Sequence, residues 1–229
     1  MGPACDNEET LRKMMENGMN VARFNFSHGS YEEHLGRYNR VVKVRDELKL
    51  PVATLFDSKG PEIRFRLFEG SKVTINDGDL FTLTTREILG NNTIGSISYK
   101  NLINDVQIGT SILVNDGLIE LKVEKVGDTD IVCRVINGGV ISDRKAINVP
   151  GVHLSLPFLS DVDRRDLEFA MKTGFDFFAL SFVRCAEDVL EVRRLQKEHN
   201  NTSKLIAKIE SQEGVENLDA IIVLLTESW

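Results

Sequence analysis

The sequence predicts an α/β fold in which helices and strands alternate around a barrel-like sheet, interrupted by a small inserted antiparallel β-barrel. Two observations support this. Toward both ends of the chain, segments with a helical stripe of apolar residues alternate with short apolar runs, as in a parallel sheet. Between them the apolar residues alternate with a period of two. We therefore expect a barrel domain made of residues 1–60 and 150–229, with the inserted domain over residues 61–149.

The first segment is predicted to fold as helix, strand, helix, strand. A capping residue, Asp6 or Asn7, opens the first helix, and Gly18 ends it. The second helix opens at a capping box formed by Ser30 and Glu33. The expected elements are a helix over 6–18, a strand over 20–26, a helix over 30–48 and a strand over 51–56. The second helix is expected to carry the stripe Tyr31, Leu35, Tyr38, Val41, Val42 and Leu48.

The inserted segment contains no convincing helical stripe and is predicted to be all β. Its expected strands cover 72–75, 80–84, 111–114, 118–123 and 131–135, with turns at 76–78, 115–117 and 137–139. After Pro150 the alternation of helices and strands resumes. The expected elements are a helix over 160–173 opened by Ser160 and Asp163, a strand over 175–183, a helix over 187–199, a strand over 205–210 and a last helix from about 212.

Composition limits the classes of function. The chain has 229 residues, 41% of them hydrophobic and 28% charged, which is ordinary for a globular protein. A formal net charge of -7 disfavours a sequence-independent nucleic-acid binder, and no apolar run approaches the length of a membrane span. The three separated cysteines, Cys5, Cys133 and Cys185, are expected to be free thiols in a reducing compartment, the cytoplasm. The four histidines and the cysteines lack metal-ligand spacing.

Charged and polar residues follow the predicted barrel strands. Residues 57–64, Asp-Ser-Lys-Gly-Pro-Glu-Ile-Arg, come directly after the apolar strand 51–56, in the position where α/β barrels keep their active sites. Side chains two positions apart on a strand share a face, as Lys208 and Glu210 do. The full expected set is Arg23, Asn25, Ser27, Asp57, Lys59, Glu62, Arg64, Arg184, Lys208 and Glu210. Its cations suit a phosphate and its oxygens suit magnesium or an alkali cation, and phosphoryl transfer needs both.

Each of these residues has a simpler structural interpretation. A Lys-x-Glu pair on a strand is usually a solvated edge, although here the flanking residues are apolar. The other structural alternatives are a salt bridge between Arg23 and Asp57, a pair between Glu62 and Arg64, a turn position for His28 and a surface position for His34. The shared position at strand ends favours a functional site over these alternatives.

At this point the chain resembles the pyruvate kinase family, over nearly its whole length up to about Ile222. The matching motifs cover residues 18–29 (GMNVARFNFSHG), 57–64 (DSKGPEIR), 147–151 (INVPG), 181–184 (SFVR) and 207–214 (AKIESQEG). The resemblance implies a partial TIM (β/α)8-type barrel whose inserted β-barrel is a mobile lid domain. It also implies phosphoryl transfer from phosphoenolpyruvate to ADP, giving pyruvate and ATP in glycolysis.

The resemblance assigns the cations to named residues. Asn25, Ser27, Asp57 and the carbonyl of Ser58, where the family usually has threonine, are expected to hold potassium. Glu210 is expected to ligate magnesium or manganese. Glu62 matches an acid that the family links to potassium dependence.

The resemblance also assigns the substrates. Arg23 and Lys208 are expected to bind phosphoenolpyruvate, Lys208 by stabilising charge on the transferring phosphoryl group. His28, Arg64 and Lys145 are expected to contact ADP or ATP. Full-length members of the family are homotetramers, and neither nucleic acid nor membrane is an expected partner.

The chain also departs from the family pattern. The family has a barrel strand before Gly2-Pro-Ala4, and its later strands supply a second magnesium carboxylate in Ala-Arg-Gly-Asp, whereas four barrel strands are counted here. We therefore expect little or no turnover by this chain alone. The alternatives are a non-catalytic fragment that binds a phosphate ligand or needs a complementing chain, and another barrel enzyme acting on phosphoenolpyruvate. The tail, residues 223–229, does not resemble the family and is interpreted as a shifted reading frame.

Overall fold

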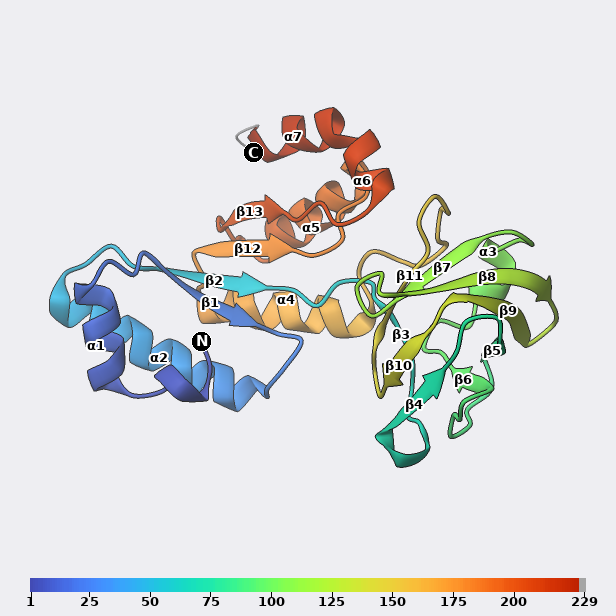
Figure 1. Cartoon of the computed structure of the whole chain (residues 1–229). Coiled ribbons are helices and arrows are strands. Elements are labelled where there is room, and N and C mark those ends of the chain that lie inside the picture. The colour runs from blue at the N-terminus through green and yellow to red at the C-terminus, as the bar shows by residue number, and fades with distance from the viewer. Residues whose placement is uncertain (227–229) are drawn as a thin grey trace. The chain divides into compact units, whose positions relative to one another are not determined.

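The computed structural model describes residues 1–226. Their contacts divide the chain into two compact units, one formed by Met1–Pro61 with the residues from Phe158 on, the other by Glu62–Pro157 (Figure 1). We call them the barrel unit and the inserted unit. Within the described residues, no helix combines the length and apolar character needed to cross a membrane.

The barrel unit alternates helices and parallel strands, as predicted. Its elements are η1 (Pro3–Cys5), α1 (Glu8–Glu16), β1 (Val21–Asn25), α2 (Tyr31–Leu48), β2 (Ala53–Asp57), α4 (Asp161–Thr173), β12 (Phe177–Leu180), α5 (Ala186–Glu198), β13 (Lys204–Ala207), α6 (Gln212–Glu216) and α7 (Leu218–Thr226). The strands form one curled parallel sheet in the order β1-β2-β12-β13. In the described chain this sheet is a partial barrel of four strands, in agreement with the predicted fold class.

Local sequence signals explain where the helices begin. The side chain of Asn7, rather than Asp6, caps α1 by accepting a hydrogen bond from Thr10 N at 2.8 Å. Ser30 opens α2 through the predicted capping box with Glu33. The same device opens α4 at residues 160–163, and α4 ends at a glycine in the left-handed conformation, as expected.

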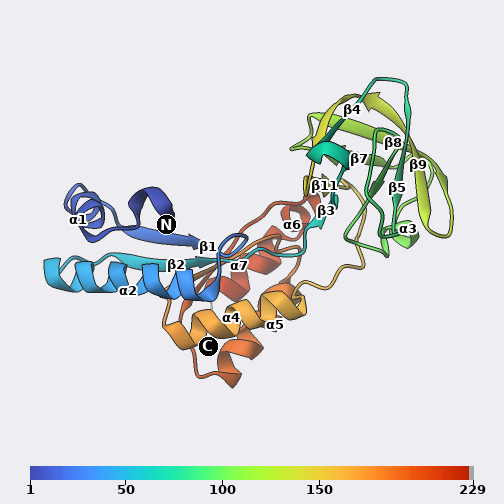
Figure 2. The ribbon, with the colours of Figure 1, turned by 90° about the horizontal axis from the view of Figure 1, so that it is seen from below.

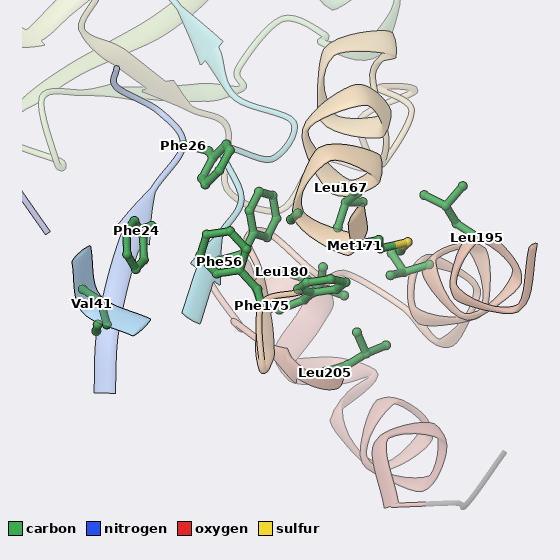
Figure 3. Close-up of a cluster of buried hydrophobic side chains, with 14 of the residues drawn as sticks. Phe24, Phe26, Val41, Phe56, Leu167, Met171, Phe175, Leu180, Leu195 and Leu205 are labelled. Carbon is green, nitrogen blue, oxygen red and sulfur yellow. The ribbon is translucent and has the colours of Figure 1, made fainter. Parts of the chain in front are cut away.

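The core of the barrel unit lies between the helices and one face of the sheet. In both ribbon views α1 and α2 lie together at the β1 end of the sheet (Figures 1 and 2). Phe24, Phe56 and Phe175 pack edge-to-face or tilted against their aromatic neighbours, with Leu180 and Leu195 in the same cluster (Figure 3). The stripe predicted at 189, 192 and 195 is buried. The opposite sheet face is partly open, and it exposes Val21 and Ile206.

The face of α2 was predicted incorrectly in part. Tyr31 and Leu35 are exposed, whereas Val41 and Val44 are buried. His34, expected at the surface, is only 3% exposed. The physical reason is that α2 turns its His34 side toward the sheet, where the imidazole stacks on Phe26 with ring centroids 4.1 Å apart.

The inserted unit is a closed β structure. Its elements are β3 (Ile63–Arg64), η2 (Glu69–Ser71), β4 (Lys72–Ile75), β5 (Leu80–Thr84), β6 (Ile94–Ser96), α3 (Leu102–Asp105), β7 (Ser111–Val114), β8 (Ile119–Val126), β9 (Asp130–Asn137), β10 (Gly139–Ser142) and β11 (Ala146–Asn148). Seven strands form a sheet in the order β3-β11-β7-β8-β9-β5-β6. Hydrogen bonds from Arg66 N to Ser96 O (2.8 Å) and from Ser98 N to Arg64 O (2.9 Å) join its two ends into a barrel.

Two details of the inserted unit differ from the prediction. The pairing is antiparallel except between β5 and β6, which run parallel because an excursion of the chain separates them. A four-residue helix, α3, is also present, and it is too short to show a helical stripe in the sequence. The predicted turn at 115–117 is confirmed in conformation, since Asn115, Asp116 and Gly117 all have positive φ.

Two barrel strands are shorter than predicted. Strand β12 stops at Leu180 rather than 183, and β13 stops at Ala207 rather than 210. Phe182 has φ 57°, a left-handed conformation that breaks the extended backbone. Ser181, Lys208 and Glu210 therefore lie on the loops just beyond the carboxyl ends of the strands.

Candidate functional site

Asp57 is the centre of the polar cluster at the carboxyl ends of the barrel strands. It is the last residue of β2, opposite Asn25 on β1 and Ala179 on β12. It is 2% exposed, so its carboxylate needs partners. Arg23 donates from Nε to Asp57 Oδ2 at 2.6 Å, and its Nη2 contacts the same oxygen. Lys208 Nζ lies 3.2 Å from the other oxygen, Oδ1.

Lys208 connects three elements. Besides Asp57, its ammonium lies 3.4 Å from Glu210 Oε1 and donates to Ser181 Oγ at 2.7 Å. About a third of the Lys208 and Glu210 side chains is exposed (32% and 35%), and Arg23 is more open at 59%. The cluster thus combines a buried anion with cationic groups that solvent or a ligand reaches, a pattern that suits binding of an anionic group.

The loop after β1 is held by its own side chains and by α2. Asn25 Oδ1 accepts from Ser27 N at 2.9 Å, and His28 N donates to Asn25 O at 3.3 Å. A ring nitrogen of His34, Nε2, donates to His28 O at 2.8 Å. Burial lowers the pKa of His34 below its usual 6.5, so the imidazole is held neutral. His28 therefore occupies the turn position of the structural alternative, and its carbonyl anchors the loop.

Ser58 and Ser181 are joined by two hydrogen bonds. Ser181 N donates to Ser58 Oγ at 2.9 Å, and Ser181 Oγ donates to Ser58 O at 2.6 Å. Both serines are buried. Sequence reasoning did not select Ser181 as a site residue. The available signal was its place directly after an apolar strand, at the start of the segment 181–184.

Three sequence-predicted residues lie in the inserted unit. Arg64 donates from Nε to Glu62 Oε2 at 2.7 Å and from Nη1 to the carbonyl of Arg144 at 2.7 Å. Lys145 is next to Arg64 in space, because its carbonyl accepts from Phe65 N at 2.9 Å. The pair between Glu62 and Arg64, proposed as a structural alternative, is present.

Arg184 lies at the start of α5. Its guanidinium pairs with Asp188 at 3.3 Å, and its backbone N–H donates to the same carboxylate at 2.9 Å. Its carbonyl accepts from Asn217 at 3.0 Å. These contacts hold the segment after β12 against α5 and α6.

The oxygen donors at the strand ends are of the chemical kind that a hard cation prefers. Asn25 and Ser27 offer side-chain oxygens, Ser58 a carbonyl, and Asp57 Oδ1 is buried without a hydrogen bond of good geometry, although Lys208 lies near it. Fewer of the described residues are suited to hold magnesium. Residues 1–226 contain no group of three or more Asp, Glu, His or Cys arranged to hold a metal, and Glu210 offers one carboxylate. One or two carboxylates with substrate phosphates are a usual magnesium environment.

Comparisons with known proteins show the family of the chain. The family described as pyruvate kinase, barrel domain, matches residues 1–227. The chain is 48% identical over 224 residues to a pyruvate kinase of Clostridium perfringens, covering 97% of this chain and 47% of that protein. With a pyruvate kinase of Staphylococcus aureus it shares 42% identity, covering 97% and 38%.

Among solved structures, a pyruvate kinase from Cryptosporidium parvum superposes with a TM-score of 0.89 at 38% identity, covering 98% of this chain and 48% of that one. The chain thus spans about half the length, or less, of these relatives. The family match extends over nearly every residue, and the structural match covers both the barrel strands and the inserted unit. The chain therefore belongs to the pyruvate kinase family.

Proposed function

We propose that this chain carries part of a pyruvate kinase active site, in which a phosphoryl group moves from phosphoenolpyruvate to ADP, giving ATP and enolpyruvate, which becomes pyruvate. The single observation that carries the proposal is the meeting of Arg23, Lys208 and Glu210 around the buried carboxylate of Asp57. The family membership of the chain supports the same reaction.

Arg23 and Lys208 are the proposed phosphoenolpyruvate ligands. Arg23 keeps 59% of its side chain exposed while Asp57 fixes its orientation, so a phosphate gains a preorganised guanidinium. Lys208 is held by Asp57 and Ser181 and would stabilise the negative charge that spreads over the transferring phosphoryl oxygens.

The proposed cations are K⁺, held by Asn25, Ser27, Asp57 and the carbonyl of Ser58, and Mg²⁺ or Mn²⁺, held by Glu210. When bound, they supply positive charge that neutralises the phosphate oxygens. We propose that Arg64, Lys145 and His28 contact the nucleotide. We further propose that Glu62 is linked to K⁺ dependence. The free cysteines support a reducing compartment, and we propose the cytoplasm.

A second candidate function is binding without turnover. One observation favours it: within residues 1–226, no group of three or more Asp, Glu, His or Cys is arranged to hold a metal. In this case the chain binds a phosphate ligand, or it acts only with a complementing chain. Binding of a phosphate ligand would need the cations of Arg23 and Lys208, whereas turnover would also need the metal ions.

The experiment separates binding from turnover with matched lysine variants. Three proteins are compared: the unaltered chain, K208M and K204M. For each, calorimetry measures the affinity for phosphoenolpyruvate and a coupled assay measures the release of pyruvate. Lys204 is an exposed lysine at the opposite end of the same strand, so K204M controls for loss of a charge. We expect K208M to weaken binding at least about tenfold, the effect of losing one charge-assisted contact, and K204M to leave it unchanged.

Each outcome has one interpretation. Binding with turnover supports the kinase, and binding without turnover supports the second candidate. If turnover appears only after a complementing polypeptide is added, the chain is one part of an enzyme. Equal affinity in K208M and the unaltered chain would reject the proposed site.

A further inference from the structure

We propose that the turn formed by Ser181 and Phe182 is the positioning element of this site. It would fix the orientation of three groups at once, the Ser58 carbonyl, the Lys208 ammonium and the Glu210 carboxylate. The inference rests on the proposed function, because it deepens the roles given there to these groups. The turn itself is not proposed to touch a substrate.

The Ser181 hydroxyl has a fixed direction. It has one proton, and its contact with the Ser58 carbonyl, 2.6 Å away, must use that proton because a carbonyl only accepts. The contact with Lys208 Nζ at 2.7 Å must then be donated by the ammonium. Ser181 is 3% exposed, so water does not readily replace either bond. Through this hydroxyl, the carbonyl proposed to hold K⁺ is connected directly to Lys208.

Phe182, the residue after Ser181, orients the Glu210 carboxylate. The backbone N–H of Phe182 donates to Glu210 Oε2 at 3.0 Å, while the other oxygen of Glu210 faces Lys208 at 3.4 Å. This N–H points at Glu210 because Phe182 has φ 57°, which turns the backbone out of the line of β12. A bulky residue in this conformation is strained and persists only where the surroundings impose it.

The surroundings that impose the turn include Gly60. A Cβ at this residue would lie 2.9 Å from both Ser181 Cβ and Ser181 O and 3.1 Å from the Phe182 ring, so only glycine allows this approach. Gly60 is itself fixed, because its N–H donates to Asp163 Oδ1 at 3.2 Å. The loops after β2 and β12 therefore pack closely against each other beside Asp57.

The test uses two variants of Ser181 and a matched control. S181A removes the hydroxyl, and S181C keeps the approximate size with a weak hydrogen-bonding group, in case S181A folds poorly. The control is S203A, because Ser203 Oγ also donates to a backbone carbonyl, that of Phe175 at 2.7 Å, at the opposite end of the sheet. Far-UV circular dichroism checks that each variant is folded.

Two readouts follow orientation rather than folding. The first is the affinity for Tl⁺, a probe for K⁺, by calorimetry with thallous acetate. The second is the rate at which an acylating reagent modifies Lys208, by peptide mass spectrometry, relative to the exposed Lys204 in the same sample. We expect S181A and S181C to weaken Tl⁺ binding about tenfold and to raise relative Lys208 acylation severalfold, as loss of a buried hydrogen bond to a charged group implies. S203A should change neither.

The outcomes distinguish this inference from the proposed function. If the unaltered chain binds no Tl⁺, the proposed K⁺ site is wrong. In that case the rates of Lys208 acylation in S181A, S181C and the unaltered chain still decide the role of Ser181. Tl⁺ affinity and Lys208 acylation that are the same in S181A, S181C and the unaltered chain would overturn the inference while leaving the proposed function intact. Equal effects in S203A would also overturn it, since they would show a general loss of order.

Discussion

Replacing Gly60 by alanine tests the close packing beside Asp57. Gly60 has φ 74°, where an L-residue pays about 1–2 kcal/mol. The added Cβ would also lie 2.9 Å from two atoms of Ser181, one of them backbone, so the loops must separate. Overpacking of this kind typically costs about 1–3 kcal/mol. Together the two terms predict a loss of about 3 kcal/mol in the free energy of unfolding of the barrel unit.

The control is G18A. Gly18 has φ 98° in the same unit, and no atom outside Gly18 and its two chain neighbours lies within 4 Å of its potential Cβ. The G18A variant should therefore lose only the free energy of unfolding that the left-handed backbone conformation costs, about 1–2 kcal/mol. Within residues 1–226, every α-helix of more than four residues belongs to the barrel unit, so urea unfolding followed by circular dichroism in the helical band reports mainly on this unit. Equal losses in G60A and G18A would refute the steric argument.

Three further predictions concern the core and two buried ionisable groups. F175A should cost about 3–5 kcal/mol in urea unfolding, because the ring is 1% exposed among other aromatic rings, and a loss below about 1 kcal/mol would contradict this packing. Burial raises the pKa of Asp166 above its usual 3.8, so the folded carboxyl binds its proton more tightly than the unfolded one, and stability falls as pH rises through the folded pKa. D166N should therefore be more stable than the unaltered chain at neutral pH and lose that advantage below 3.8, and melting curves at both pH values check it. Burial lowers the pKa of His34 below its usual 6.5, so stability should decline as pH falls from 6.5 through the folded pKa, and melting curves of H34Q should show a flatter decline over this range.

The sequence predicted those features that depend on local chemistry. The capping boxes at Ser30 and Ser160 are local patterns of four residues, and both formed as expected. The gathering of Arg23, Asp57 and Lys208 followed from their positions at the ends of apolar strands, because parallel strands bring their carboxyl ends to one edge.

Features that depend on distant contacts were not predictable in the same way. A serine in an apolar run is ordinary. Ser181 matters because it is hydrogen-bonded to Ser58, which lies 123 positions earlier in the chain. The burial of His34 depends on stacking against Phe26 across the loop between them. The predicted ends of β12 and β13 are too late because Phe182 and Val183 are apolar and residues 208–210 alternate charged and apolar side chains, patterns that continue a strand. Phe182 turns the backbone for reasons outside the local sequence.

The pairing of β1, β2 and β12 has a consequence for how the gene can vary. Asp57 stands level with Asn25 and Ala179 because the hydrogen-bond register of the three strands fixes that level. Neighbouring side chains on a strand point to opposite faces, so the loss or gain of one residue within 53–56 would turn the side chains of both Phe56 and Asp57 to the opposite face of the sheet. Such a change would leave every polar residue of the site in the sequence, but the Asp57 side chain would no longer lie among the others. We expect this strand to accept conservative substitutions far more readily than a single-codon insertion or deletion.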